Sequence, residues 1–237
     1  MANALKLISA LLSYPTLELL DAGAELHAAL AADKMTGARE KQWLAKLIDD
    51  LASHDLYDAQ ERYVLLFDRT RTNSLHLFEH VHGESRDRGQ AMVDLAMMYE
   101  AQGFDIDAQE LPDYLPLFLE YLSTQSAEEI NNLLGQTLHI IAALRARLQK
   151  RGSIYANAFL VLEALAGKRV DADAVAEILK VPEVDPNDLG ALDEIWEEEA
   201  VSFMGNTGEG ACGPDRLRRV IRAGNRPPPQ PENRGGH

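Results

Sequence analysis

The chain has 237 residues, of which 46% are hydrophobic and 26% are charged, and its one cysteine is Cys212. This hydrophobic content can fill a core without the help of disulfides or bound metals. A lone cysteine excludes an internal disulfide and any zinc or iron–sulfur site built from this chain's cysteines alone. A net charge of −15 disfavours nucleic-acid binding, because phosphate backbones repel an acidic protein. No segment has the uninterrupted apolar length of a signal peptide or membrane span, so we expect a cytoplasmic protein without direct membrane insertion.

Apolar residues recur at helical spacing from the start of the chain. The first two stripes cover residues 5–12 and 17–20, separated by Pro15, and a third covers residues 44–51. We expect Asp55 to cap the helix that follows it. The apolar face of that helix carries Tyr63, Leu66 and Phe67.

The helical pattern continues through the middle of the chain. Residues 88–102 predict a helix that ends at Gly103, and Pro112 stands where the next helix is expected to start. The sequence from Ser126 matches a capping box and opens a long helix that runs to Gly152.

Later stripes at residues 159–165, 175–179 and 192–203 complete a pattern without alternating strands or hairpin signals. We therefore predict an all-α, single-domain bundle of about ten helices over residues 1–204. The basic tail, residues 205–237, is rich in Gly, Arg and Pro and holds six arginines against three acidic residues. It has too few apolar residues to offset the entropy of ordering, so we expect it to be disordered.

Residues 73–94 are the densest in groups able to bind or catalyse. His76, Glu79 and His80 match the His-x-x-Glu-His pattern of inverted zinc peptidases, which gives the alternative of a metal-binding helical-bundle enzyme. Glu79 and His82 also match one Glu-x-x-His element of di-iron bundles. The di-iron architecture needs a second such element, which the chain lacks, and the zinc pattern lacks an obvious third ligand.

The remaining interpretation of this segment is recognition of another chain. The chain has no P-loop, Gly-x-Gly-x-x-Gly or Gly-x-Ser-x-Gly motif, which argues against an ATP-driven chaperone or a serine hydrolase. The alternative is structural: Arg86 or Arg88 pairs with nearby acids and holds a helix corner. The candidate peptide-binding residues are Phe78, Glu79, His80, His82, Glu84, Arg86, Asp87 and Arg88.

Residues 110–121 form a second candidate segment. Glu110 and Asp113 would attract a cationic peptide into an adjoining groove, although Pro112 and Asp113 are also what a helix start requires. A third segment, residues 193–199, is acidic. It is either a solvated acidic helix face with Trp196 buried or a docking face for a basic partner. The candidate groove residues are Glu110, Asp113, Leu117, Glu120 and Tyr121.

Several of these blocks together closely resemble the NarJ-type chaperones of respiratory nitrate reductase, in the wider group of redox-enzyme maturation and twin-arginine leader chaperones. The similarity runs over most of residues 5–204, and its longest block is specific to that family. The blocks that carry it are residues 66–69, 74–95, 110–113, 115–122 and 196–199.

The resemblance implies a cytoplasmic helical chaperone, also called the nitrate reductase delta subunit, which serves anaerobic nitrate respiration and is not part of the mature enzyme. It would hold the apo catalytic (alpha) subunit, alone or with the beta subunit, partly by its N-terminal segment. Molybdenum cofactor (molybdopterin guanine dinucleotide) and an iron–sulfur cluster would then be inserted before membrane docking. Molybdenum cofactor biosynthesis proteins are further implied partners, and the chaperone itself would bind no cofactor stably.

The sequence departs from the wider group at one position. Twin-arginine leader chaperones often carry a histidine after the Pro-Asp pair, whereas this chain has Tyr114. A role that the resemblance implies for a histidine at this position is therefore not carried over to this chain.

Overall fold

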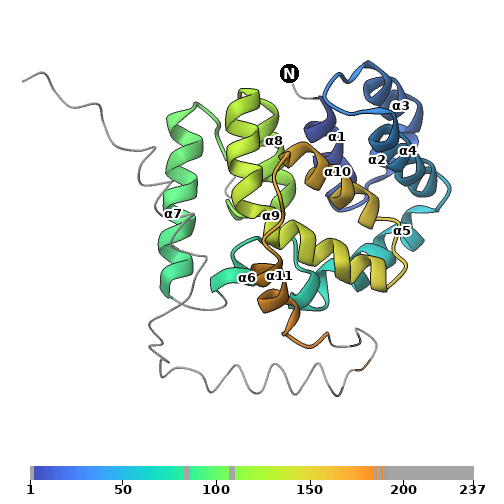
Figure 1. Cartoon of the computed structure of the whole chain (residues 1–237). Coiled ribbons are helices and arrows are strands. Elements are labelled where there is room, and N and C mark those ends of the chain that lie inside the picture. The colour runs from blue at the N-terminus through green and yellow to red at the C-terminus, as the bar shows by residue number, and fades with distance from the viewer. Residues whose placement is uncertain are drawn as a thin grey trace, which may run out of the picture.

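Helices account for the regular structure in the described part of the chain, which comprises residues 3–82, 86–106, 110–183, 185, 188 and 190 of a computed structural model. The all-helical prediction is confirmed there, and the tail beyond residue 204 and the acidic segment 193–199 lie outside the described residues. The elements, shown in Figure 1, are α1 (Asn3–Leu12), α2 (Leu17–Asp21), α3 (Gly23–Ala32), α4 (Ala38–Ala52), α5 (Leu56–Tyr63), the π-helical η1 (Val64–Asp68), the 3₁₀ turn η2 (Arg71–Asn73), α6 (Glu79–His82), α7 (Arg86–Ala101), α8 (Leu115–Ser123), α9 (Ala127–Lys150), α10 (Ala156–Ala166) and α11 (Ala172–Leu179).

Side-chain caps explain where several helices begin. The Asp55 carboxylate accepts the N–H groups of Tyr57 and Asp58, which confirms the predicted start of α5. The Ser126 hydroxyl accepts the N–H of Glu129 at the start of α9. The helix after Asp55 differs from the prediction in one respect: regular α structure ends at Tyr63, and a π-helical turn carries Leu66 and Phe67.

Glycine ends two of the predicted helices. Gly103 follows α7 with φ +71°, a conformation that glycine adopts without steric cost. The N–H of Phe104 then bonds to the carbonyl of Tyr99, so the last turn of α7 is closed. Gly152 ends α9 in the same way, with φ +65°.

The helix expected to start at Pro112 begins later, at Leu115, with Pro116 in its first turn. The reason is an extended pairing with a distant segment, because His76 and Tyr114 form an isolated antiparallel bridge. The N–H of Leu77 bonds to the carbonyl of Asp113 at 3.0 Å, and the N–H of Leu115 bonds to the carbonyl of Leu75 at 2.8 Å. Pro112 and Asp113 form a turn, closed by the N–H of Tyr114 on the carbonyl of Leu111, and the bridge holds Tyr114 extended. The helix therefore begins only after Tyr114.

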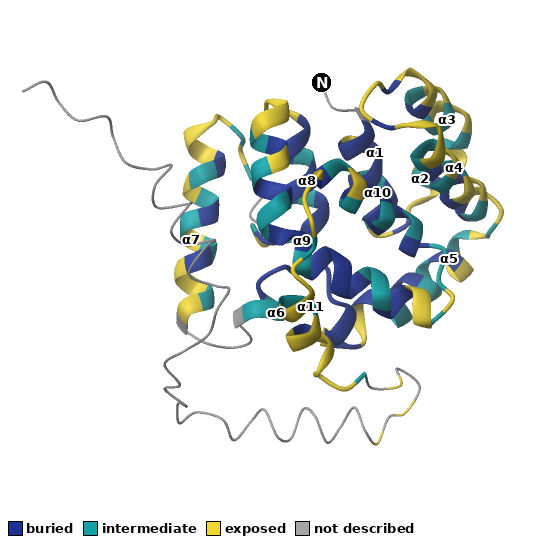
Figure 2. Ribbon diagram, viewed as in Figure 1, coloured by how far each residue is buried: buried dark blue, intermediate teal, exposed yellow. Residues whose placement is uncertain are grey.

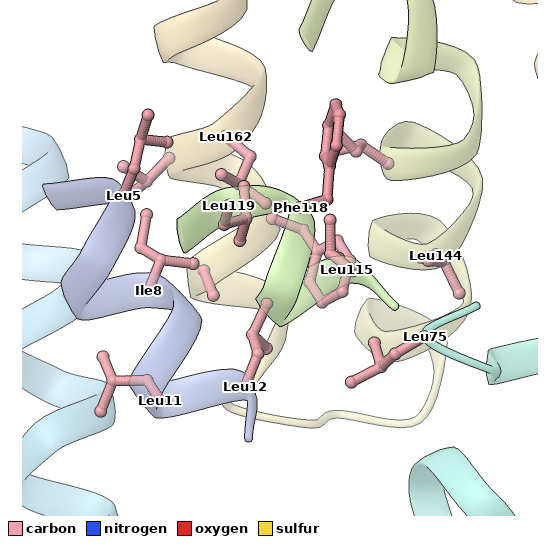
Figure 3. Close-up of a cluster of buried hydrophobic side chains, with 14 of the residues drawn as sticks. Leu5, Ile8, Leu11, Leu12, Leu75, Leu115, Phe118, Leu119, Leu144 and Leu162 are labelled. Atoms are coloured by element: carbon pink, nitrogen blue, oxygen red, sulfur yellow. The ribbon is translucent and has the colours of Figure 1, made fainter. Parts of the chain in front are cut away.

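The core lies between α9 and the helices around it (Figures 1 and 2). α9 packs against α8, α10 and α11, and α1 packs against α8, α3 and α10. None of the described helices, α9 included, is both long and apolar enough to cross a membrane. Figure 3 shows how side chains from α1, α8, α9 and α10 meet in the core: Leu5, Ile8, Leu11 and Leu12 from α1, Leu115, Phe118 and Leu119 from α8, Leu144 from α9 and Leu162 from α10, with Leu75 from the loop before α6.

Candidate functional site

Asp113 is a buried link between two candidate segments. Its side chain is fully buried; Oδ2 accepts the N–H of Phe78 at 3.0 Å, and Oδ1 lies 3.2 Å from Nδ1 of His76. The expectation that Asp113 supplies charge to a surface groove is therefore wrong. The carboxylate instead satisfies a buried backbone donor, which stabilises the junction between the loop before α6 and the start of α8.

The two histidines of the zinc-like pattern do not share a helix face. His76 lies in the extended bridge, before α6 begins at Glu79, so the four-residue spacing does not place the two histidines on one helix face. His80 has a different partner: its Nε2 donates to the carbonyl of Ser74 at 2.8 Å. Within the described residues no three His, Cys, Asp or Glu side chains gather in a way that could hold a metal ion. The geometry removes the basis of the metalloenzyme alternative.

The two histidines also have opposite protonation tendencies. Burial lowers the pKa of His76, but the hydrogen bond and charge of Asp113 and the charge of Glu79 outweigh it, so the net shift is upward. Burial lowers the pKa of His80, and the nearby Arg147 charge acts in the same direction. At neutral pH His80 is therefore an uncharged side chain.

The charged corner between α6 and α7 is held by an ion pair. Arg88 Nη2 donates to Glu79 Oε1 at 3.1 Å, and both side chains are about four-fifths buried, with 20% and 19% exposed. The predicted internal pairing of Arg88 with Glu79 is thus confirmed. Asp87 is exposed in the first turn of α7. Glu84 and the side chains of His82 and Arg86 lie outside the described residues.

Two aromatic candidates belong to the core instead. Phe78 exposes 1% of its surface and Tyr121 exposes 2%. The Tyr121 ring packs on Tyr99 at a centroid distance of 4.6 Å and on Phe104 at 5.7 Å. The expectation that Tyr121 lines an open groove is wrong, because α7 and the loop after it cover this face of α8.

A surface groove does exist beside α8, and α1 forms its other wall. Glu110, Leu117 and Glu120, three of the predicted residues, line this groove, which has a volume of about 330 Å³. The Ser9 hydroxyl donates to the carbonyl of Pro116 at 2.6 Å and fixes the two walls together. The remaining lining residues are Ser9, Ser13, Tyr14, Tyr114 and Pro116.

Two tyrosines contribute to the lining of this groove. The Tyr114 hydroxyl contacts that of Tyr63 at 3.0 Å, and burial, with a contribution from the Glu110 charge, raises the Tyr114 pKa to about 12. Tyr14 exposes 46% of its surface. The described lining residues include two carboxylates and no Lys or Arg. The groove therefore combines partly apolar surface with negative charge, which suits a cationic amphipathic segment.

A second pocket, of about 170 Å³, lies between η2, α6, α7, α9 and α11. Glu79, His80 and Arg88 from the sequence candidates line it, together with Arg71 and Arg147. Arg147 exposes only 2% of its surface. This pocket is rich in guanidinium groups and shares no lining residue with the groove between α1 and α8.

Sequence reasoning missed the α1 wall and the buried arginine. Ser9 and Pro116 are 107 positions apart, and no local pattern joins them. Arg147 left a readable signal, because it interrupts the apolar stripe of α9 between Leu144 and Leu148. A cation at a core-facing helical position predicts a specific buried role.

A family model described as "Nitrate reductase delta subunit" matches residues 31–161 of the chain. Among curated proteins, the chain is 46% identical over 209 residues to the "Nitrate reductase molybdenum cofactor assembly chaperone NarJ" of Escherichia coli (strain K12). This alignment covers 88% of the chain and 87% of the relative.

Two further relatives extend this similarity. The chain is 41% identical over 218 residues to the "Probable nitrate reductase molybdenum cofactor assembly chaperone NarW" of the same strain, which covers 92% of the chain and 90% of the relative. It is 34% identical over 158 residues to the "Probable nitrate reductase molybdenum cofactor assembly chaperone NarJ" of Bacillus subtilis (strain 168), which covers 66% and 84% respectively.

Proposed function

The chain belongs to the nitrate reductase delta subunit family, and we propose that it is a dedicated chaperone that holds the apo catalytic subunit of respiratory nitrate reductase in the cytoplasm. Its relatives are named as assembly chaperones, so its role is assembly and not catalysis. The client is the catalytic subunit, alone or with its beta subunit. Molybdenum cofactor and an iron–sulfur cluster enter the client before it docks at the membrane, and cofactor biosynthesis proteins are the further partners.

The observation that carries this proposal is the groove between α1 and α8. Leu117 and Tyr114 offer apolar surface, and Glu110 and Glu120 offer negative charge. An amphipathic helix with basic residues complements both features. Its apolar side would pack on Leu117 and Tyr114, and its cations would pair with the two carboxylates. We assign this groove to the N-terminal segment of the client.

The mechanism follows from differential binding. The client segment is free in the apo subunit and is withdrawn when that subunit folds around its cofactors. The chaperone therefore stabilises the apo state and is released from the loaded state, without ATP. The acidic groove also sets the direction of the salt dependence, because exposed ion pairs weaken as ionic strength rises.

Calorimetric titration of the full chain with a peptide of the client's N-terminal segment tests the assignment. In the double variant Glu110→Gln and Glu120→Gln, we expect about tenfold weaker binding at low salt, since each exposed pair contributes up to about 1 kcal/mol. The loss should shrink to less than about threefold near 0.5 M NaCl.

A matched control keeps the net charge equal. Glu25 on α3 and Glu177 on α11 are exposed carboxylates outside the groove, and their double Gln variant should bind like the wild type. Equal losses in both double variants would assign the effect to overall charge and remove the groove assignment. Co-purification of the apo catalytic subunit tests the chaperone role separately, whatever the peptide result.

A further inference from the structure

The C-terminal tail contains a segment whose chemistry matches the groove between α1 and α8. Residues 216–222 read Arg-Leu-Arg-Arg-Val-Ile-Arg, with four arginines and no acidic residue. At helical spacing Leu217, Val220 and Ile221 share one side, and the arginines flank that side or face away from it. The segment lies outside the described residues, and this pattern is a property of its sequence alone. It belongs to the class of cationic amphipathic segments that the groove fits.

The groove presents negative charge that the rest of the described chain does not neutralise. Glu110 is exposed and Glu120 is half-buried, and neither has an ion-pair partner among the described residues. Leu117 and Tyr114 add apolar surface beside them, and the volume of about 330 Å³ takes side chains of a short segment. Opposite charges on the groove and on residues 216–222 therefore favour contact between them.

The chain between these two parts is long enough for them to meet. Residues 191–215 separate Gly190, the last described residue, from Arg216. A chain of about 25 residues spans up to roughly 80 Å when extended, whereas a domain of about 190 residues has a radius of gyration of about 16 Å. A tether of such length keeps its end at an effective concentration on the order of 1 mM near the domain. Even a weak contact is then populated within one molecule.

We propose that residues 216–222 occupy the groove between α1 and α8 when no client is bound, as an internal competitor of the client segment. The proposal rests on the assignment of this groove to the client under the proposed function. The tail segment lacks the residues for a core of its own, and it gains order by docking, with its apolar side on Leu117 and Tyr114. Its arginines pair with the two carboxylates of the groove.

The competition sets a threshold for the client. The apparent dissociation constant of the client segment rises by the factor 1 + C/K, where C is the effective concentration of the tail and K is the tail's own dissociation constant for the groove. With C about 1 mM and K about 0.1 mM, client binding weakens about tenfold. Basic segments that bind weakly are then excluded, and a client segment that binds tightly displaces the tail.

Disulfide trapping through Cys212 tests the contact without any client. Cys212 is the only cysteine and stands four positions before Arg216. In the full chain, Ser13→Cys places a second thiol in the groove, and Glu177→Cys places one at an exposed position on α11 that is closer to Cys212 along the chain. Oxidised glutathione drives formation of the intrachain bond. Mass spectrometry follows its rate, normalised to the reaction of each introduced thiol with glutathione alone.

We expect the bond to form at least about fivefold faster in Ser13→Cys than in Glu177→Cys, because docking raises the local concentration of Cys212 at the groove. A tether without docking predicts the opposite order, since the shorter loop closes more readily. Adding Glu110→Gln and Glu120→Gln should remove the advantage of Ser13→Cys. Equal or slower formation in Ser13→Cys overturns the proposal.

Calorimetric titration with the client peptide measures the competition itself. In the full chain, Arg218→Gln with Arg222→Gln should tighten peptide binding about three- to tenfold at low salt, and the gain should vanish near 0.5 M NaCl. The matched control is Arg226→Gln with Arg234→Gln, which removes the same charge from the tail outside the segment. This control should stay within about twofold of the wild type.

An uncharged change separates docking from net charge. Leu217→Ser with Ile221→Ser keeps every arginine but removes the apolar side of the segment, and it should also tighten peptide binding several-fold, on the order of the arginine pair. Equal gains in the segment and control arginine pairs would assign the effect to overall charge and overturn the proposal.

Failure of this proposal is distinguishable from failure of the groove assignment. If Glu110→Gln with Glu120→Gln leaves peptide binding unchanged, the client lies elsewhere, and trapping of Cys212 at Ser13→Cys still decides whether the tail docks in the groove. If that double variant weakens peptide binding while both changes in residues 216–222 bind the peptide as the wild type does, the groove assignment stands and the tail proposal is overturned.

Discussion

The Asp113 carboxylate accepts the backbone N–H of Phe78 at 3.0 Å, although the two residues are 35 positions apart in the sequence. Both are almost completely inaccessible, with 0% and 1% of their surface exposed. The bond joins the two most distinctive segments of the chain, the loop that leads into α6 and the start of α8. The two segments, which are far apart in the sequence, therefore form one structural unit.

Replacement of Asp113 should therefore act on stability. Asp113→Ala leaves the buried N–H of Phe78 without an acceptor and removes the partner of His76, so we expect a loss of about 3 kcal/mol in the free energy of unfolding. Asp113→Asn keeps one acceptor and should lose less. Urea denaturation measures both, and Asp21→Ala, at an exposed position on α2, should change stability by less than about 0.5 kcal/mol.

The position of Asp113 also shows what sequence patterns can and cannot predict. Apolar spacing and caps such as Asp55 and Ser126 are local, and they predicted the helices well. The pairing of residues 75–77 with 113–115 depends on two segments meeting in space. Pro112 and Asp113 have the composition of a helix start, but they form a turn. The distant pairing at Tyr114 delays the helix and places the Asp113 carboxylate in the interior.

The same limit applies to the candidate groove. Leu117 and Glu120 lie one turn apart on α8, so helical spacing predicts that they share a side, and Glu110 lies close to them in the sequence, in the loop before α8. The opposite wall comes from α1, which no spacing rule connects to α8. Tyr121 lies on the same helix, but its ring packs on Tyr99 of α7 and is covered.

The buried Arg147 should stabilise the packing of α11 against α9. Arg147→Met keeps much of the apolar volume but leaves the carbonyls of Thr72 and Ile178 without their donor, and we expect a loss of about 2 kcal/mol. Relative to the wild type, amide hydrogen exchange in the variant should become faster in α11 and change less in α10. If exchange in α11 is unchanged, the guanidinium does not hold this contact.

The neighbouring Arg145 provides the control. It lies on the same helix, bonds to Glu163 and Gln149, and has 26% of its side chain exposed. Arg145→Met should cost less than about 1 kcal/mol, because partly solvated ion pairs contribute little to stability. The contrast separates the effect of burial from the loss of any arginine on α9.

His76 predicts a pH dependence with a definite sign. Its pKa in the folded state lies above the ordinary histidine value of 6.5, since Asp113 and Glu79 outweigh the effect of burial. The protonated form is therefore favoured by folding, and its contribution is fully present below pH 6.5 and is lost as the pH rises through the folded-state pKa.

The difference in unfolding free energy between the wild type and His76→Gln measures this contribution. It should be larger at about pH 5.5 than at about pH 8.5, because glutamine does not titrate. His80 is shifted in the opposite direction, but it is present in both proteins and largely cancels in the difference. A difference that grows with pH would contradict the assigned pairing.

In the described part of the chain, two exposed surfaces carry apolar residues that a client segment could occupy, the groove and one side of α7. Leu117 lines the groove on α8, whereas Val93 and Met97 expose 53% and 51% of their surface on α7. Exposed apolar residues on a helix can also mark a binding face. Charge placed at each position tests which surface takes the client segment.

Leu117→Lys introduces a cation between Glu110 and Glu120 and should weaken binding of the basic client peptide by tenfold or more, as a rough estimate for a like charge within an interface. Leu117→Met preserves the apolar contact and should bind nearly as the wild type does. Met97→Lys adds the same charge on α7 and should change affinity less than about twofold. If Met97→Lys causes the larger loss, the client segment lies on α7 and the groove between α1 and α8 is not its site.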